Sequence, residues 1–178
     1  MRDPQRLTVD EFFAWQALVE GRYELVDGHI IPHPDYVTPL GFAAPDTEHG
    51  LICLNLGVAL QAQLRAPCRA YVGVGVVVDR GDANIPDVAV SCDEQDRTRP
   101  ALVAPRYLFE VSSPKTYRID TGRKVAEYLA IPTIEAYVVV DRPRRSLTVY
   151  RPDAGPQTFN AGIVALGDVS LDVDAIFA

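Results

Sequence analysis

The chain has 178 residues, of which 48% are hydrophobic and 23% are charged, a composition typical of a soluble globular protein. This length suits one domain of ordinary size, so we expect residues 1–178 to form a single domain. The formal net charge of −7 counts against a general nucleic-acid binder, whose surface is usually basic, without excluding a nucleic-acid substrate. The longest uncharged apolar run, near residues 72–78, is too short to span a membrane as a helix.

The amino terminus and the cysteines bear on location and redox state. The amino-terminal segment is polar, so we expect no signal peptide. The three cysteines, Cys53, Cys68 and Cys92, are scattered and fit no motif spacing, and we expect them to be reduced thiols of a cytoplasmic protein. Basic residues concentrate between Arg97 and Lys124, where a local basic rim and an ordinary solvated surface both fit their distribution.

The first predicted elements are a helix and a hairpin. Thr8 and Glu11 form the pattern of a capping box ahead of an apolar stretch, which predicts a helix over residues 8–19. Alternating segments on both sides of Asp27-Gly28 predict a β-hairpin over residues 22–32, because this dipeptide favours the tight turns that join antiparallel strands.

A proline-rich segment and a long helix follow. Residues 33–45 contain three prolines and a glycine, and we expect them to form a loop. Apolar residues then recur at helical spacing, which predicts an amphipathic helix over residues 47–64. Its expected apolar stripe consists of Leu51, Leu54, Val58, Leu60 and Leu64.

The second half of the chain predicts most of a sheet. Strands are expected over residues 70–78, 84–91, 106–112, 135–140 and 146–150, with a polar loop over 92–100. Asp120 is expected to cap a helix that runs to about residue 130. No internal repeat or linker interrupts this order, so we expect a mixed α/β domain whose central sheet is flanked by helices.

Two carboxylates lie inside apolar runs of neighbouring predicted strands. Asp87 belongs to the run Ile85–Val90, and Glu110 belongs to the run Tyr107–Ser113. Burying a carboxylate among such residues is costly unless a cation neutralises it. If the two strands pair, both carboxylates can reach one point above the sheet. Since oxygen ligands without a cysteine cluster suit a hard cation, we expect Mg²⁺ or Mn²⁺ rather than structural zinc.

Lys124 is the third member of this candidate site, in the first turn of the helix that follows. With a metal-bound pair of carboxylates, a lysine can orient an attacking water or stabilise charge on a phosphate, the chemistry of a metal-dependent phosphodiesterase. The alternative is that Lys124 pairs with Glu127 or another nearby carboxylate on the surface, and spacing alone favours neither interpretation.

Other candidates are weaker on spacing alone. Glu24 could be a further metal ligand, but its position favours a strand residue that faces solvent. His49, at the start of the long helix, is more typical of a helix-start or core-edge residue than of a catalyst. Ser112 and Ser113 have no histidine placed to activate them, and the chain lacks a glycine-rich phosphate loop, a nucleophile-elbow serine and the common zinc motifs.

The arrangement of Asp87, Glu110 and Lys124 resembles the PD-(D/E)XK nuclease superfamily. Within it, the chain is similar to the Uma-two family of restriction endonuclease-like proteins, formerly a domain of unknown function. The matching segments, in chain order, are residues 7–12, 22–28, 49, 85–90, 109–114, 120–128, 134–141 and 171–177. The likeness extends over nearly the whole chain, and the order and spacing of the segments are more specific than any single motif.

This resemblance implies a restriction-endonuclease-like α/β core that binds a divalent metal through Asp87 and Glu110. The carbonyl of Val111 is an expected further ligand. The superfamily's simplest pattern has a lysine two residues after the glutamate, where this chain has Ser112. The resemblance therefore transfers the role of catalytic lysine to Lys124.

The resemblance also changes the interpretation of Glu24 and His49. It implies that Glu24 is an additional acidic member of the site rather than a solvent-facing strand residue. It raises His49 to a candidate supporting residue beside the metal, with a structural role as the equal alternative.

The function that these expectations favour is a metal-dependent endonuclease that hydrolyses phosphodiester bonds, with DNA as the expected substrate. Mg²⁺ or Mn²⁺ is the expected cofactor, and a homodimer is an expectation taken from the nuclease class. One alternative is a non-catalytic binding or regulatory protein on the same scaffold, which the acidic charge favours slightly. Another is a phosphohydrolase for small nucleotides, which would also explain an acidic surface.

Overall fold

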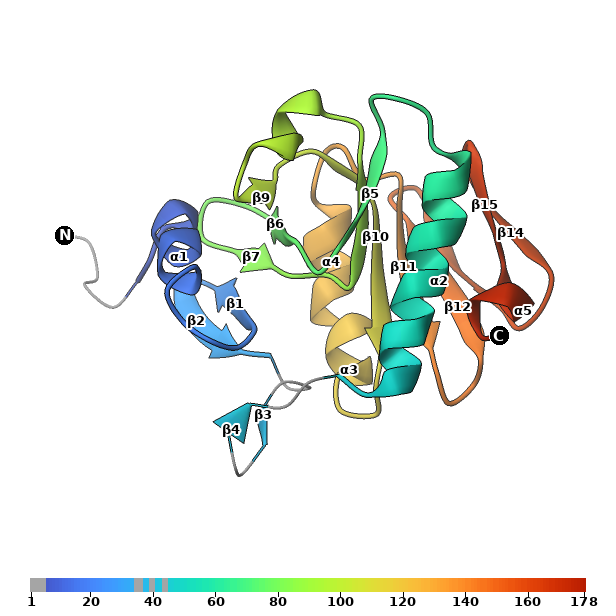
Figure 1. The fold of residues 1–178 in the computed structure, drawn as a ribbon, viewed down its shortest axis with the longest axis horizontal. Helices are drawn as coiled ribbons and strands as arrows, with labels where there is room; N and C mark the ends of the chain where they lie inside the picture. The colour runs from blue at the N-terminus through green and yellow to red at the C-terminus, as the bar shows by residue number, and fades with distance from the viewer. Residues whose placement is uncertain (1–5, 34–36, 39–40, 43–44) are drawn as a thin grey trace.

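The central feature of the fold is a six-stranded sheet (Figure 1). The structure is a computed structural model, and it describes residues 6–33, 37–38, 41–42 and 45–178. The strand order of the sheet is β13-β12-β11-β10-β8-β5. These strands span Ala154–Phe159 (β13), Ser146–Arg151 (β12), Ala136–Asp141 (β11), Pro105–Ser112 (β10), Val88–Ser91 (β8) and Arg69–Val72 (β5). Strands β10 and β11 pair in parallel and the other neighbours pair antiparallel, so the expected mixed sheet is confirmed.

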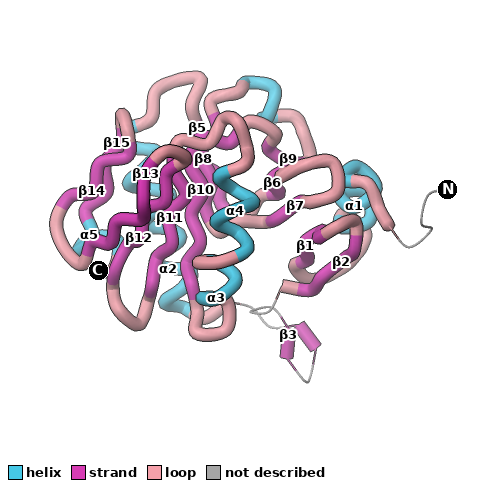
Figure 2. Tube along the Cα trace, turned by 180° about the vertical axis from the view of Figure 1, so that it is seen from behind, coloured by secondary structure: helices cyan, strands magenta, loops and turns pink. Residues whose placement is uncertain are grey.

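Helices cover both faces of this sheet (Figures 1 and 2). One face carries α2 (Thr47–Gln63), α5 (Val173–Ile176) and the hairpin of β14 (Ile163–Leu166) and β15 (Val169–Asp172). The other face carries α3 (Tyr117–Asp120) and α4 (Arg123–Leu129). The alternation of β10 serves both layers, because Phe109 packs on the α2 side and Leu108 on the α4 side. Among the described residues, no helix has the length and apolar character needed to cross a membrane.

A second sheet is built around the amino-terminal hairpin. Its five strands follow the order β2-β1-β7-β6-β9 and span His29–Pro32 (β2), Tyr23–Val26 (β1), Ala83–Asn84 (β7), Gly75–Val77 (β6) and Ala101–Leu102 (β9). Helix α1 (Val9–Gln16) packs on it, with Phe12 buried against Leu25. The predicted capping box and hairpin are both confirmed, and Asp27 and Gly28 take the positive φ values of 50° and 77° that the turn requires. Helix α1 is shorter than expected.

Two predicted strands, over residues 70–78 and 84–91, are each divided between the two sheets. The first becomes β5 and β6, and the second becomes β7 and β8. Pro86 lies at the second division, where a residue without an N–H group cannot continue the ladder. Asp87 therefore lies immediately before β8 and not inside a strand as expected. The division places this residue at the junction where the two sheets meet.

Helix α2 has the predicted extent but buries a different face. Leu51, Leu54 and Val58, which were expected in the apolar stripe, are 47%, 59% and 61% exposed. The buried residues are His49, Ile52, Cys53, Leu56 and Leu60, which also recur at helical spacing. Because two overlapping sets of apolar residues both recur at helical spacing, periodicity alone could not predict which set is buried. Burial of the second set directs His49 and Cys53 towards the sheet.

Several local predictions are corrected by the structure. Asp120 caps no helix: it is the last residue of α3, and α4 starts after Gly122. The expected loop over 33–45 contains the short strands β3 (Val37–Thr38) and β4 (Gly41–Phe42), and its remaining residues up to 44, apart from His33, lie outside the described part of the chain. The expected loop over 92–100 contains a 3-10 helix, Glu94–Arg97.

The expectation of three reduced thiols is wrong for two of the cysteines. Cys68 and Cys92 form a disulfide across a separation of 24 residues, while Cys53 is a free, buried thiol. Cys68 lies just before β5 and Cys92 just after β8, and these strands pair with Arg69 opposite Ser91. Strand pairing between segments distant in sequence brings the two cysteines together, which no motif spacing could reveal.

Gly75 in β6 provides a test of the packing between α1 and the second sheet. A β-carbon at this position would overlap a ring carbon of Phe13 and lie 3.3 Å from the β-carbon of Ala101. We expect Gly75→Ala to lower the free energy of unfolding by about 1–3 kcal/mol, as overpacking typically does. Gly155→Ala is the matched control, because its β-carbon would meet nothing within 4 Å. Chemical denaturation of both variants measures the difference, and equal stabilities would contradict this packing.

Candidate functional site

Asp87 is held at the junction between the sheets by donors from three directions. Its carboxylate accepts the backbone N–H of Val111 at 2.8 Å and Nη1 of Arg22 at 3.0 Å, and Nε2 of His49 lies 3.3 Å from Oδ2. Burial acts to raise the pKa of Asp87, but His49, Arg22 and Val111 together hold it below its ordinary value. The side chain is therefore an oriented, buried anion.

Glu110 lies inside β10 and faces helix α4. Its Oε1 accepts the hydroxyl of Tyr128 at 2.8 Å and Nζ of Lys124 at 2.9 Å. Burial is the largest influence and raises the pKa of Glu110 well above its usual range; Lys124 opposes this effect, and the charge of Asp87 adds to it. The structure thus brings Asp87 and Glu110 close enough for their charges to interact, as the pairing of β8 with β10 predicted.

Lys124 is at the centre of a group of buried carboxylates. Its side chain is 1% exposed, and Nζ lies 2.7 Å from Oε1 of Glu24, 2.9 Å from Oε1 of Glu110 and 3.8 Å from Oδ1 of Asp120. Burial acts to lower the pKa of Lys124, but these negative charges raise it overall, so the amine keeps its proton.

The alternative of a surface pair between Lys124 and Glu127 is wrong. Glu127 instead pairs with Arg123, whose Nη1 lies 2.7 Å from Oε1. Helix α4 starts at Arg123, so Lys124 is the second residue of its first turn, and the side chain is directed into the protein.

Glu24 reaches the same group from the second sheet. It lies in β1, is 3% exposed, and accepts Nη2 of Arg123 at 2.8 Å in addition to its pair with Lys124. Burial acts to raise the pKa of Glu24, but Lys124 lowers it below the ordinary value. The solvent-facing position that spacing favoured is therefore wrong. The pairing of β1 with β7 delivers this residue to the site across a long stretch of sequence.

Asp120 and Arg22 are members of this cluster that sequence reasoning missed. Asp120 is 2% exposed and accepts the hydroxyl of Ser112 at 2.7 Å, while its Oδ1 has no hydrogen-bond partner among the described residues. Arg22 is 8% exposed and contacts the Ile85 carbonyl as well as Asp87. Both residues belong to segments that carried the family resemblance. On sequence alone, Asp120 was expected to cap a helix and Arg22 to begin the hairpin segment, so neither was assigned to the site.

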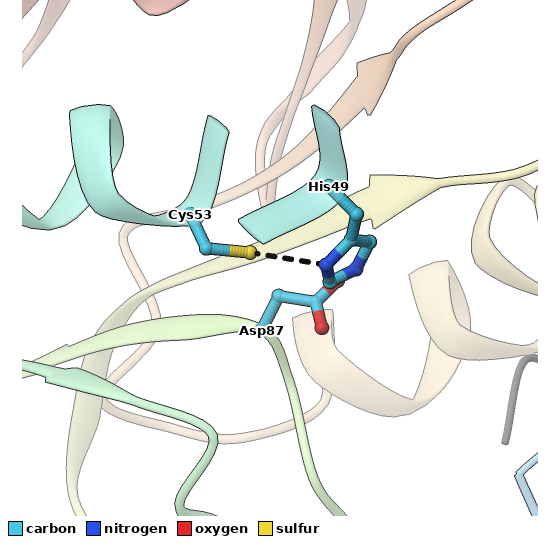
Figure 3. Close-up of side chains that lie close together, drawn as sticks. All are labelled: His49, Cys53 and Asp87. Atoms are coloured by element: carbon cyan, nitrogen blue, oxygen red, sulfur yellow. Dashed lines mark hydrogen bonds and ion pairs between the residues drawn. The ribbon is translucent and has the colours of Figure 1, made fainter. Parts of the chain in front are cut away.

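His49 and Cys53 lie beside Asp87 (Figure 3). Both come from α2 and are one helical turn apart, and Sγ of Cys53 is 3.5 Å from Nδ1 of His49. Burial raises the pKa of the Cys53 thiol to about 12, with the charge of Asp87 as the next cause. His49 is thus in direct contact with the candidate site, whereas the sequence offered no signal for Cys53.

The charges of the site fit a divalent cation. Four carboxylates, those of Glu24, Asp87, Glu110 and Asp120, are buried, whereas three cations lie beside them: buried Lys124 and Arg22, and half-buried Arg123, which pairs with Glu24. Negative charge therefore exceeds positive charge in a region that water does not solvate. Burial raises the pKa of Glu110 and the charges of Asp87 and Asp120 add to this effect, while Oδ1 of Asp120 has no hydrogen-bond partner among the described residues. Asp87 and Glu110 offer the oxygen ligands that Mg²⁺ and Mn²⁺ prefer.

Comparison with known proteins supports the family that the order of sequence segments indicated. The model of a family described as "Putative restriction endonuclease", Uma2, matches residues 9–173. The chain belongs to the Uma2 family. An uncharacterized protein of Synechocystis sp., slr1290, is 23% identical over 156 residues, which are 82% of this chain and 74% of that protein.

A solved structure shares the fold of this Uma2 chain. It is the crystal structure of "a putative nuclease belonging to DUF820" from Anabaena variabilis, and it matches with a TM-score of 0.74. The match covers 96% of this chain and 97% of the other at 18% sequence identity, which supports a shared fold. The expected family and fold class are therefore confirmed.

Four of the seven basic residues between Arg97 and Lys124 pair with carboxylates. Arg99 pairs with Asp93 and Asp96, Arg106 pairs with Glu135 and Asp168, and Arg123 and Lys124 pair with the carboxylates described above. These pairs resemble an ordinary solvated surface more than the free basic rim that was the other alternative.

His33, near the Lys124 cluster, predicts a pH dependence of stability. Burial, with Lys124 and Arg22, lowers the pKa of His33 from 6.5 to about 3. Below pH 6.5 the unfolded chain therefore binds a proton that the folded chain does not, and the stability contributed by neutral His33 is lost as the pH falls. Between pH 7 and 5.5, the free energy of unfolding should fall by about 1 kcal/mol more in the unaltered protein than in His33→Gln. Equal changes in both proteins would contradict this burial of His33.

Proposed function

We propose that this protein is a metal-dependent endonuclease that hydrolyses phosphodiester bonds in DNA, with residues 1–178 acting as one restriction-endonuclease-like domain. The observation that carries the proposal is the position of Lys124, buried with its ammonium group between Glu110 and Glu24. A protonated amine kept beside two carboxylates that can bind a metal is the arrangement that stabilises charge on a phosphate during hydrolysis.

Asp87 and Glu110 would hold Mg²⁺ or Mn²⁺, with the Val111 carbonyl as a further ligand. The bound metal would polarise the phosphate and make a coordinated water more acidic. The backbone N–H of Val111 and the guanidinium of Arg22 orient Asp87, and Tyr128 orients Glu110. Such fixed ligands need little rearrangement during the reaction.

Lys124 would orient the attacking water and stabilise negative charge on the phosphate. Oε1 of Glu24 lies 2.7 Å from the ammonium group, so Glu24 would act as a positioning residue for Lys124. Asp120 supports the same ammonium group at longer range. His49 would support Asp87 through its contact with Oδ2.

A cleavage assay tests this proposal. The protein is incubated with double-stranded DNA, single-stranded DNA, RNA and nucleoside triphosphates, with Mg²⁺, with Mn²⁺ or with a chelator. Metal-dependent cleavage of DNA is the expected result. Turnover of nucleotides alone would instead support a small-nucleotide phosphohydrolase, and no turnover of any substrate would support a non-catalytic protein on this scaffold.

We also propose that the protein acts in the cytoplasm, where its DNA substrate would lie and where disulfides such as Cys68–Cys92 are uncommon. Thiol titration of protein purified under reducing conditions checks whether this bond persists.

A homodimer is the expected assembly, and sedimentation at several protein concentrations measures it.

A further inference from the structure

Three side chains of different donor chemistry meet where α2 approaches the junction before β8 (Figure 3). They are His49, Cys53 and Asp87, and all three are buried. One potential ligand atom from each lies within 4.8 Å of the others. Sulfur, nitrogen and oxygen donors together suit zinc and similar borderline metals, whereas an all-oxygen set suits magnesium.

The spacing of the helical pair matches the geometry of zinc. His49 and Cys53 are four residues apart, which places both side chains on one face of α2. Their Nδ1 and Sγ atoms are 3.5 Å apart. A tetrahedral zinc ion at about 2.0–2.1 Å from nitrogen and about 2.3 Å from sulfur would separate these atoms by about 3.6 Å. The pair therefore needs little movement to bind such an ion.

Asp87 supplies the third donor. Its Oδ2 lies 3.3 Å from Nε2 of His49, whereas Cys53 lies beside Nδ1, the other ring nitrogen, so the side chains must reorient for one ion to contact all three. Arg22 and the backbone N–H of Val111 orient the carboxylate of Asp87, as the hydrogen-bond partners of metal ligands commonly do. Three protein ligands leave the fourth tetrahedral position for a solvent molecule. On binding, the ion would replace the thiol proton of Cys53, which passes to solvent.

We propose that His49, Cys53 and Asp87 form a binding site for Zn²⁺ or a metal of similar chemistry, separate from the all-oxygen magnesium site but sharing Asp87 with it. Because one carboxylate serves both sites, zinc and magnesium compete. Zinc would therefore inhibit the magnesium-dependent cleavage, a consequence that rests on the proposed function, whereas zinc binding itself does not.

Titration of the full chain with Co²⁺, a spectroscopic substitute for zinc, tests the binding. The unaltered protein should develop a thiolate-to-cobalt charge-transfer band in the near ultraviolet. Cys53→Ser should lose the band and bind cobalt at least about ten-fold more weakly. The Cys68→Ala/Cys92→Ala double variant retains Cys53 as its one thiol and should keep the band.

The outcomes separate this site from the nuclease activity. Absence of the band in the unaltered protein, or its survival in Cys53→Ser, would overturn the site regardless of any result on DNA. Where cleavage is measurable, the zinc concentration for half inhibition, taken relative to each protein's own rate without zinc, should rise at least about ten-fold in Cys53→Ser. Equal inhibition of both proteins would overturn the competition.

Discussion

Asp87→Asn is expected to reduce metal-dependent DNA cleavage by at least about 100-fold, because the amide keeps the shape of the carboxylate but not its charge. Asp87 is buried and accepts hydrogen bonds from Arg22 and Val111, which fix the position of its carboxylate as a metal ligand. The rate of DNA cleavage at saturating Mn²⁺ measures the effect.

Two further variants control this experiment. Glu110→Gln should cause a similar loss, since Glu110 supplies the other proposed metal ligand. Asp153→Asn, a matched change at an exposed aspartate in the turn between β12 and β13, should leave cleavage unchanged. Circular dichroism establishes that each variant is folded. Cleavage by folded Asp87→Asn at the rate of the unaltered protein would refute the role of Asp87.

Lys124→Met is expected to lower the free energy of unfolding by about 3–5 kcal/mol, the usual cost of breaking a buried ion pair from one side. The methionine fills a similar volume, but it leaves Glu24 and Glu110 buried without the ammonium group that lies 2.7 and 2.9 Å from them. DNA cleavage should be lost as well, because the ammonium group proposed to stabilise charge on the phosphate is removed. Chemical denaturation measures the first effect and the cleavage assay the second.

The chain offers a matched control for this substitution. It contains two lysines, and Lys115 is exposed, so Lys115→Met should change stability by less than about 0.5 kcal/mol. Adding Glu110→Gln to Lys124→Met removes one of the unpaired charges and should recover part of the lost stability. If both lysine variants are equally stable, Lys124 is not the buried counter-ion of this cluster.

The local elements could be predicted from sequence because their signals are local. The capping box of Thr8 and Glu11 and the turn at Asp27-Gly28 each satisfy backbone requirements within a few residues. The runs around Asp87 and Glu110 were similarly informative, since a carboxylate among apolar residues implies burial beside a cation. The order of these segments was sufficient to identify the family.

The composition of the site depended on contacts between distant segments. Arg22 meets Asp87 across 65 residues, and Glu24 meets Arg123 across 99 residues. These contacts follow from strand pairing and from the division of two predicted strands between two sheets, which no local pattern specifies. The same pairing joins Cys68 to Cys92.

The sequence by itself identified Asp87 and Glu110, because each carboxylate lies within an apolar run where it is costly to bury, and the family resemblance added Lys124 and Glu24. Only the tertiary structure decided that Lys124 is enclosed by acidic residues and that Asp87 faces both Arg22 and His49. It also chose the buried face of α2, and so brought Cys53 to the site. The physical reason is that a side chain's cost of burial is encoded locally, whereas its partners are selected by packing of the whole chain.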